Sequence, residues 1–556
     1  MEDKPLKNKN IFTVCDIYWE RVFLHFIIES TGGEKEVVFK LLNFHTHENV
    51  AVEIEKSGEN QYHFCLNIAA ANVRSFLENG NWSIVYRLKE SEKYEECLLS
   101  IELGYRLDEL TRVFRYCGEE FAYTINFSVS SNDQENLTLV IKSYFMRKNN
   151  KWRKRHLVYR PESGKGVQVI TKVFSALWIW GINIWYRICG IFRSRKKLHI
   201  LLMNETNKLN TGNLQMIDKR LRERNLDEII HISYSFREAL GKKSSIFSWI
   251  KLITILALQD IIILDNFTPV FSFLKIRKDV DLIQVWHAGG GFKAVGYCRF
   301  GKDGSPFPEG SCHKAYTLAV TGSEHLTKVF EEVFGIEKEA FLPIGMPRLD
   351  GYLDPENIQN FRDGFYKKYK QFRNKKIILF APTYRGTGQK DAYYDYNKIN
   401  LEKIYEVCGD EYVFLIKMHP FIKKHIEIPP RLSDKIFDFS DFPSINDLFY
   451  VTEILITDYS SNFYEFSLMR KPMLFYTYDR HIYELTRGVY RNVKESAPGK
   501  VCDTFDELIA SLKDKDFECE KVEKFVKENF SHEMGNATDK LIDEVILKKY
   551  ENKRNE

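Results

Sequence analysis

The chain has 556 residues, of which 44% are hydrophobic and 28% are charged, and its formal net charge at pH 7 is +4. This length is too great for one hydrophobic core and the composition is too apolar for a disordered polymer, so we expect two to four folded domains. So small a charge is not by itself the signature of a nucleic-acid-binding protein, and we expect no nucleic-acid partner.

The ten cysteines are scattered along the chain, without a CxxC pair or a spacing suited to zinc. This pattern indicates a reducing compartment such as the cytosol rather than a disulfide framework. The opening residues, MEDKPLKNKN, are polar and lack the apolar run of a signal peptide.

Residues 1–146 are predicted to form an all-β accessory domain. Short runs rich in β-branched and aromatic residues recur at 36–42, 82–88 and 137–141, with turn-forming residues between them. Several short strands at this spacing are typical of a small sandwich. The sequence assigns this domain no activity, so a binding or spacer module is the default interpretation.

Residues 147–197 are predicted to form a membrane-associating linker helix. The stretch 173–186 has 14 residues without a charge and contains Trp178, Trp180 and Trp185. A helix of that length spans roughly 21 Å, short of the roughly 30 Å hydrocarbon core of a bilayer. An interfacial helix on anionic lipid therefore fits better than a membrane span, and a buried connector helix is the other alternative. The flanking basic residues are Arg147, Lys148, Lys151, Arg153, Lys154, Arg155, Arg160, Arg193, Arg195, Lys196 and Lys197.

From residue 198 onward, strand and helix patterns alternate. They predict two tandem Rossmann-like α/β domains with parallel sheets, at 198–372 and 373–556. The expected strands are 198–203, 229–232, 261–264, 282–286, 316–320 and 341–344, then 376–380, 412–418, 436–439, 453–457 and 472–476. Such folds bind ligands at the carboxyl ends of their strands, so we expect a site between the two sheets.

The first candidate site segment is QVWHAGGGFK, at 284–293. His287 can act as a base near neutral pH, and glycines such as Gly289 and Gly290 let the backbone approach a substrate closely. Lys293 can hold a phosphate. The structural alternative is a tight turn with a hydrogen-bonded core histidine, and the segment matches neither a P-loop nor a GxGxxG motif.

Two further segments follow predicted strands of the second domain. FAPTYRG offers the Thr383 hydroxyl and the Arg385 guanidinium, which suits a pair of phosphate oxygens. IKMHP presents His419 in a turn that Pro420 fixes. A solvated surface arginine and a structural histidine are the corresponding alternatives.

The most informative segment runs from a β-branched strand into Asp458, Tyr459, Ser460 and Ser461, and a helical pattern follows at once. The free N–H groups and the dipole of a helix N-terminus favour an anion, and the two serines add hydroxyl donors. Simple helix capping by Asp458 or a serine is the alternative. Downstream, Glu465 lies one turn into this helix, and Arg487 is another candidate phosphate clamp.

Together these segments suit phosphate chemistry. No Asp, Glu and His cluster in the sequence resembles a divalent-metal cage, so we expect no metal or other cofactor. We expect a helix N-terminus, arginine and lysine to neutralise a pyrophosphate instead.

Six motifs occur in order from about residue 281 to residue 512, namely VWHAGGGFKAVGY, IGMPRLD, FAPTYRG, IKMHP, SINDLFYVTEILITDYSSNFYEFSLMRKPMLFYTYD and YELTRGVY. In these motifs the chain resembles the CDP-glycerol glycerophosphotransferase family, the teichoic acid polymerases and primases of Gram-positive bacteria. The resemblance implies a GT-B architecture and transfer of a polyol phosphate from a CDP-activated donor, with release of CMP.

The resemblance also implies roles for single residues. His287 matches the proposed general base, and His419 matches the second functional histidine, which stabilises charge on the pyrophosphate. Ser460 and Ser461 match phosphate-contacting serines. Thr383, Arg385, Asp458, Glu465 and Arg487 are expected in the donor pocket, and Gly289, Gly290 and Lys293 on the acceptor side.

One departure from the family pattern concerns the acceptor. The usual Gly-Thr-Pro-Leu-Lys-Lys after the first histidine is replaced here by Ala-Gly-Gly-Gly-Phe-Lys. This difference affects the expected acceptor more than the chemistry.

The leading hypothesis is a peripheral enzyme at the cytoplasmic face of the cell membrane. It would transfer glycerol phosphate or ribitol phosphate from the CDP form to an undecaprenyl-linked teichoic acid or capsular polymer. A GT-B glycosyltransferase that uses a nucleotide sugar is the alternative, and a non-enzymatic polymer-binding component is a third. The sequence does not decide between glycerol and ribitol, between one addition and many, or between oligomeric states.

Overall fold

A computed structural model describes residues 11–32, 36–44, 46–52, 54–71, 76–89, 91–116, 121–132, 135–147, 165–194, 196–205, 210–237, 245–287, 289–290, 292–299, 311–386, 388–531 and 534–555. The chain divides into two compact units. One comprises Met1–Glu162 with Asp479–Val489, and the other comprises Ser163–Tyr478 with Tyr490–Glu556.

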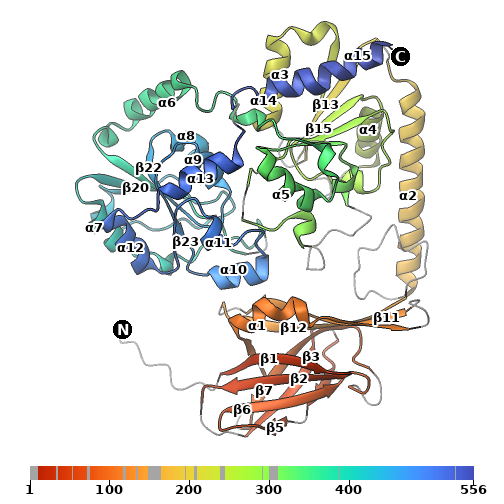
Figure 1. Ribbon diagram of the computed structural model, residues 1–556, viewed down its shortest axis with the longest axis vertical. Coiled ribbons are helices and arrows are strands. Elements are labelled where there is room, and N and C mark those ends of the chain that lie inside the picture. The colour runs from red at the N-terminus through yellow and green to blue at the C-terminus, as the bar shows by residue number, and fades with distance from the viewer. Residues whose placement is uncertain are drawn as a thin grey trace. The chain divides into compact units, whose positions relative to one another are not determined.

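The first unit is built on a 12-stranded sheet (Figure 1). Nine of its strands have the order β4-β3-β7-β12-β9-β1-β2-β6-β5. In addition, β8 pairs with β7, β11 pairs with β12, and β10 pairs with β11. The strands form one continuous sheet rather than two separate ones, because β12 pairs with β7, β9 and β11. Their bounds are β1 Phe12–Glu20, β2 Phe23–Ser30, β3 Val37–Asn43, β4 Asn49–Ala51, β5 Ile54–Lys56, β6 Gln61–Asn67, β7 Gly80–Leu88, β8 Glu95–Glu96, β9 Leu98–Leu99, β10 Arg112–Tyr116, β11 Phe121–Ser131 and β12 Leu137–Arg147.

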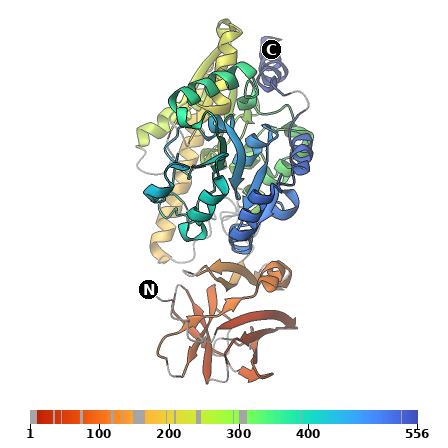
Figure 2. The same ribbon diagram turned by 90° about the vertical axis from the view of Figure 1, so that its left-hand side faces the viewer.

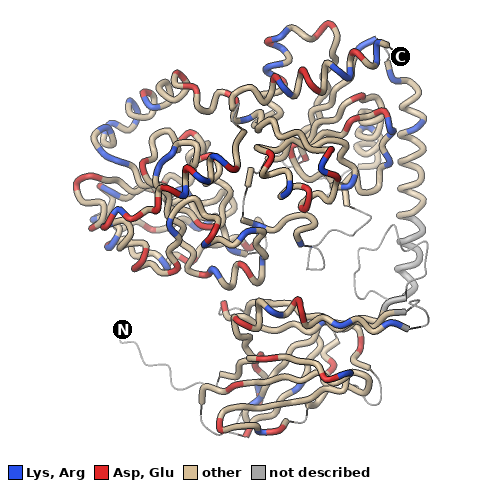
Figure 3. The backbone as a smooth tube through the Cα atoms, in the orientation of Figure 1, with Lys and Arg blue, Asp and Glu red and all other residues tan. Residues whose placement is uncertain are grey.

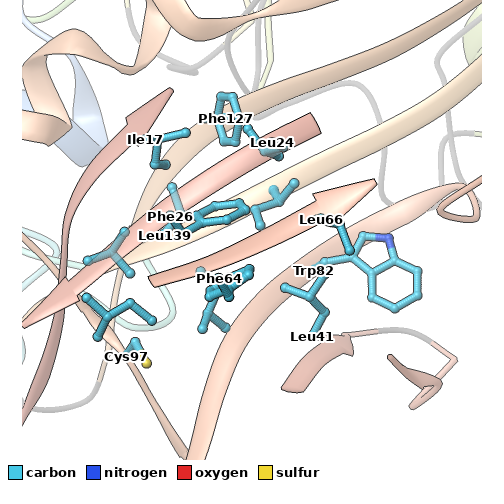
Figure 4. Close-up of a cluster of buried hydrophobic side chains, with 14 of the residues drawn as sticks. Ile17, Leu24, Phe26, Leu41, Phe64, Leu66, Trp82, Cys97, Phe127 and Leu139 are labelled. Atoms are coloured by element: carbon cyan, nitrogen blue, oxygen red, sulfur yellow. The ribbon is translucent and has the colours of Figure 1, made fainter. Parts of the chain in front are cut away.

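The sheet encloses an aromatic core. Phe26 and Phe64 stack with ring centroids 4.5 Å apart, and Trp82 is completely buried among aliphatic side chains (Figure 4). The Trp82 indole Nε1 donates to the Glu78 carbonyl at 3.1 Å and to Ser143 Oγ at 3.0 Å. The single N–H of this buried indole is therefore shared between two acceptors.

One helix of this unit comes from far along the sequence. α10 (Arg480–Arg487) packs against α1 (Ile101–Arg106) and β11. Leu485 contacts the position that a side chain on Gly104 would occupy, and the Tyr105 hydroxyl donates to Glu484. Residues nearly 380 positions apart are thus joined, an arrangement that local sequence patterns do not predict.

The second unit contains two six-stranded sheets whose strands are all parallel. The first has the order β14-β13-β15-β16-β17-β18, and the second has the order β21-β20-β19-β22-β23-β24. The bounds are β13 Leu198–Asn204, β14 Ile230–Phe236, β15 Ile261–Leu264, β16 Asp281–Gln284, β17 Leu318–Val320, β18 Phe341–Leu342, β19 Lys376–Phe380, β20 Tyr412–Ile416, β21 Ile436–Asp438, β22 Thr452–Thr457, β23 Met473–Tyr476 and β24 Lys500–Cys502.

Helices flank both sheets, as the turned view in Figure 2 shows for the second. The bounds are α2 Lys165–Ile191, α3 Gly212–Glu223, α4 Ile246–Ala257, α5 Glu324–Phe334, α6 Pro355–Lys368, α7 Leu401–Cys408, α8 Ile445–Phe449, α9 Asn462–Ser467, α11 Val493–Ser496, α12 Phe505–Asp514, α13 Glu520–Asn529, α14 Ala537–Leu541 and α15 Lys548–Asn555. The predicted α/β fold with parallel sheets is confirmed, and β24 was not expected from the sequence.

The C-terminal segment returns to the first sheet. Leu541, Ile542 and Ile546 are buried in the same core as β13 and β15, and Lys553 Nζ lies 2.6 Å from the Asp260 carboxylate. Figure 1 shows α14 and α15 beside α3 accordingly. The predicted boundary at residue 373 correctly separates the two sheets. However, α14 and α15 follow the second sheet in sequence and pack with the first, because apolar residues of this C-terminal segment complete the core of the first sheet.

The predicted linker is only partly described. Its basic residues Lys148, Lys151, Arg153, Lys154, Arg155, Arg160 and Arg195 lie outside the described residues. α2 is 27 residues long, and its buried face includes Ile182, Tyr186 and Cys189. None of the helices that the structure describes combines the length and the apolarity needed to cross a bilayer.

Replacing Trp82 by alanine is expected to destabilise the β-rich unit by about 3–5 kcal/mol, because the substitution opens a large cavity in the core. Urea denaturation followed by far-ultraviolet circular dichroism measures the change. Trp180, which is 66% exposed, is the matched control. Equal effects of Trp82→Ala and Trp180→Ala would contradict this view of the core.

Candidate active site

Polar side chains gather where adjacent parallel strands end. In the second sheet, β20, β19 and β22 are neighbours, and they lead into His419, Thr383 and Asp458 respectively. In the first sheet, β16 leads into His287. Carboxyl ends of parallel strands share one edge of a sheet, so each sheet presents its candidate residues together.

His287 is held by a backbone acceptor. Its Nδ1 lies 3.1 Å from the carbonyl oxygen of Asp265, which follows β15, and the residue is solvent-exposed. A carbonyl only accepts, so in the neutral ring Nδ1 carries the proton and Nε2 keeps a free lone pair. Although the residue is exposed overall, desolvation of the imidazole by the surrounding protein lowers the pKa of His287, while the Asp265 backbone and carboxylate oppose the shift. The residue is thus a neutral imidazole whose Nε2 can accept a proton.

A buried network fixes the backbone that carries His287. Asn213 Nδ2 donates to the Asp265 carboxylate at 2.8 Å and to the Trp286 carbonyl at 2.7 Å. The backbone N–H of Arg348 donates to Asn213 Oδ1 at 3.0 Å. Trp286 itself has a φ of 47°, a left-handed conformation that is unfavourable for a bulky residue and that turns His287 away from the strand direction.

His419 has the opposite hydrogen-bonding arrangement. Its Nδ1 accepts from the backbone N–H of Phe421 at 3.2 Å, so in the neutral ring Nε2 carries the proton. Burial, then the charges of Lys293 and Lys417, lowers the pKa of His419 to about 4. The Tyr384 ring packs 4.7 Å from the imidazole between centroids. Near neutral pH, His419 is therefore a neutral hydrogen-bond donor.

Arg385 and Asp458 form a buried ion pair. Arg385 Nη1 lies 2.9 Å from Asp458 Oδ2, and the rings of Tyr394, Tyr459 and Tyr478 surround the guanidinium at 5.3–5.6 Å. Asp458 Oδ1 also accepts from the backbone N–H of Thr383 at 2.8 Å. The pair holds the ends of β19 and β22 together, so Arg385 is not the solvated surface residue that the sequence allowed.

Lys293 joins the two sheets. Its Nζ donates to Thr383 Oγ1 at 3.1 Å, although the lysine follows the first sheet and the threonine follows the second.

Ser460 is half-buried and donates its backbone N–H to Asp458 Oδ1 at 3.3 Å, and Ser461 is exposed. The Ser461 side chain makes no capping hydrogen bond to α9, the helix that it precedes. The capping alternative therefore does not describe Ser461.

Glu465 and Gly289 have packing roles. Glu465 is buried and forms an ion pair with Arg348, and burial raises its pKa against the effect of that arginine. A Cβ on Gly289 would lie 2.1 Å from the Tyr464 ring, whereas one on Gly290 would meet no atom closer than 3.4 Å. Gly289 is thus required for the loop to lie against α9.

Arg487 is not placed with these residues. It is the last residue of α10 and belongs to the β-rich unit. Its role in donor binding stays a prediction.

Sequence reasoning missed Asp265, Asn213 and Arg348. Asp265 follows β15 just as His287 follows the neighbouring β16, so the same strand-end rule predicts it. Arg348 lies in the quoted IGMPRLD motif, but no feature of that motif indicated a partner in the second sheet. Within the described part of the chain, no group of three or more His, Cys, Asp or Glu residues is arranged to hold a metal ion.

Replacing Asp458 by asparagine is expected to destabilise the second unit by about 3–5 kcal/mol, because it leaves the Arg385 charge buried without a counter-charge. Chemical denaturation measures the effect. The exposed Arg470–Glu523 pair is the control, and Glu523→Gln should change stability by at most about 1 kcal/mol. A small effect of Asp458→Asn would show that the buried pair does not organise the strand ends.

Comparisons with known proteins identify the family. A family model described as CDP-Glycerol:Poly(glycerophosphate) glycerophosphotransferase matches residues 186–547. The teichoic acid ribitol-phosphate polymerase TarL of Staphylococcus aureus is 29% identical over 96% of this chain and 99% of that protein. The teichoic acid poly(ribitol-phosphate) polymerase of Bacillus spizizenii is 36% identical over 61% of this chain, which spans only 54% of that longer protein.

A solved structure of the wall teichoic acid polymerase TagF shares the fold, with a TM-score of 0.53 and 21% identity over 70% of this chain and 100% of that one. The match of the family model covers more than half of the sequence. The chain therefore belongs to the CDP-glycerol:poly(glycerophosphate) glycerophosphotransferase family.

Proposed function

We propose that the chain transfers a polyol phosphate from a CDP-activated donor to a hydroxyl of a teichoic acid or related polymer, with release of CMP. Family membership supports this reaction class. The main structural support for the mechanism is that the two site histidines favour different neutral tautomers. Nε2 is a hydrogen-bond acceptor in His287 and a donor in His419. We assign a GT-B arrangement, with an acceptor half at 198–372 and a donor half at 373–556.

In this mechanism His287 is the general base. Its Nε2 takes the proton of the acceptor hydroxyl while the hydroxyl oxygen attacks the polyol-linked phosphorus of the donor. The Asp265 carbonyl holds the ring in the required tautomer, and the nearby Asp265 carboxylate favours the imidazolium that forms. As the new P–O bond forms, the bond to the CMP phosphate oxygen breaks, and CMP leaves with the electron pair.

His419 stabilises the charge that develops on the pyrophosphate. Its Nε2–H can donate to a phosphate oxygen without carrying a charge of its own. Lys293, Thr383, Ser460 and Ser461 supply further donors around the same strand ends, and neutralisation by these groups requires no metal. Arg385 and Asp458 act as positioning residues, since they bind each other.

The relatives favour one donor to test first. TarL and the Bacillus spizizenii polymerase are both named for ribitol phosphate. We therefore propose CDP-ribitol as the donor, with CDP-glycerol as the comparison.

The base assignment predicts both a rate loss and a pH dependence. His287→Ala should lower CMP release by about 10²- to 10⁴-fold. A base must be neutral to act, so kcat/KM is full above the pKa of His287 and falls as the pH drops through it. Because burial lowers this pKa below 6.5, the acid limb should lie below pH 6.5.

The rate loss and the pH dependence are both tested by measuring CMP release from CDP-ribitol and from CDP-glycerol with a lipid-linked acceptor analogue. The measurements run from about pH 4.5 to about pH 8, because the ordinary pKa of histidine is about 6.5. His231→Ala, at an exposed histidine on β14, is the control. Unchanged CMP release by His287→Ala would exclude His287 as the base. If the wild type releases no CMP from either donor, a nucleotide sugar becomes the favoured donor.

We also propose that the lipid-linked acceptor, carried on undecaprenyl, is met at an anionic membrane surface on the cytoplasmic side. Exposed apolar residues of α2 recur at helical spacing, and α4 lies beside α2 with exposed residues at its start. They are Leu177, Trp180, Ile188 and Ile191 of α2 and Ile246, Phe247 and Ile250 of α4. Arg187 and Lys251 are exposed on the same helices, and Figure 3 shows α2 otherwise nearly uncharged over its described length. This composition suits an interfacial helix pair.

Vesicle sedimentation of the full chain tests the membrane surface. Binding should require anionic lipid, and Trp180→Glu or Phe247→Glu should weaken it by about tenfold or more, because each removes a large apolar side chain from the interface. Leu353→Glu, at an exposed apolar residue outside these helices, should bind like the wild type. Equal binding by all of these variants would contradict the proposal.

A further inference from the structure

A cavity lies between α5, α11 and α13, and none of the site residues described above lines it. It has a volume of about 420 Å³. Its charged lining comprises His325, Arg491, Glu495, Lys521, Lys524 and Glu528. None of these residues has a role in the mechanism proposed above.

Arg491 is the informative member of this lining. Its Nη1 donates to Asn529 Oδ1 at 3.3 Å, but its Nη2 is buried and has no hydrogen-bond partner among the described residues. No described carboxylate forms an ion pair with it, and burial lowers its pKa below the ordinary value of an arginine. A desolvated guanidinium with an unused donor is unfavourable unless an anion completes it. The planar donor fork of a guanidinium matches a pair of oxygens on an anion such as a phosphate.

The other charges define the ligand further. Lys524 is exposed and has no ion-pair partner among the described residues, whereas Lys521 is paired with Glu518. Glu495 and Glu528 add acceptors to the same cavity. A ligand that carries only negative charge would be repelled by these carboxylates. A ligand with one phosphate and several hydroxyl donors satisfies both kinds of lining residue.

Two residues next to the cavity lining in sequence, Asn529 and Tyr490, contact the loop that follows His287. Asn529 Oδ1, which accepts from Arg491, lies 3.4 Å from the position that a Cβ on Gly290 would occupy. The backbone carbonyl of Asn529 accepts a hydrogen bond from the Tyr464 hydroxyl at 2.9 Å. Tyr490, the neighbour of Arg491, donates its backbone N–H to the Phe292 carbonyl at 2.7 Å. The cavity lining is therefore connected to the acceptor-side loop through Asn529 and Tyr490.

We propose that this cavity is a second subsite for the polymeric acceptor, which binds a phosphodiester-linked polyol unit other than the reacting one. This inference rests on the proposed function, because it takes the acceptor to be a polyol phosphate chain. Each repeat of such a chain carries one negative phosphodiester and free hydroxyl groups, the combination that Arg491, Lys524 and the two glutamates require. The subsite gives an acceptor with several repeats an advantage over an acceptor with one.

The test compares Arg491→Gln and Lys524→Gln with Lys527→Gln in the full chain. Lys527 is an exposed lysine of α13 outside the cavity lining, which makes it the matched control for Lys524. Two measurements are made: CMP release with acceptors of one and of several polyol phosphate repeats, and calorimetric binding of a glycerol phosphate oligomer without donor. Lys524 is exposed, so its replacement should leave folding intact even if Arg491→Gln does not fold.

We expect the wild type and Lys527→Gln to have a lower KM for the longer acceptor. Both cavity variants should lose most of that length dependence and bind the oligomer roughly tenfold more weakly. A raised KM for the CDP donor would instead place the cavity in the donor site, and an unchanged length dependence would overturn the subsite. If the wild type releases no CMP but binds the oligomer through Arg491 and Lys524, the proposed function fails and the site remains.

Discussion

The arrangement of the second unit depends on how closely one loop of the first sheet approaches one helix of the second. Gly289 lies so near the Tyr464 ring that any side chain there would overlap it. The same loop packs Phe292 against Phe463 at 4.8 Å between centroids and extends Lys293 to Thr383. The buried Arg348–Glu465 pair joins the sheets through a second path. Because His287 precedes this loop directly, its position relative to the DYSS segment follows from that packing.

The two histidines illustrate how backbone geometry sets chemical roles. Desolvation lowers the pKa of both imidazoles, but one Nδ1 faces a carbonyl and the other faces an N–H. The side chains are identical, so the difference comes entirely from the main chain of Asp265 and Phe421. A proton acceptor and a proton donor near neutral pH are what attack by a hydroxyl on a pyrophosphate requires.

Much of this organisation could be predicted from the sequence, since it depends on local patterns. The parallel strands and the polar residues at their ends were predicted because buried strands are continuous apolar runs and their ends are abrupt. Contacts over long separations were not predicted: α10 in the β-rich unit, Arg348 with Glu465, and the return of Ile542 to the first core. Each depends on shape complementarity between distant segments, which no periodicity encodes. Arg385 and Asp458 were both predicted at the site, but their buried ion pair was not.

The most direct test of this account is the rate of CMP release by Gly289→Ala, compared with Gly364→Ala. A Cβ on Gly364 of α6 would meet no atom within 4 Å, so that variant controls for the substitution itself. We expect Gly289→Ala to fold but to lose most of its activity, because the methyl group pushes the loop and His287 away from α9. Full activity of Gly289→Ala would contradict the close approach on which the site is built.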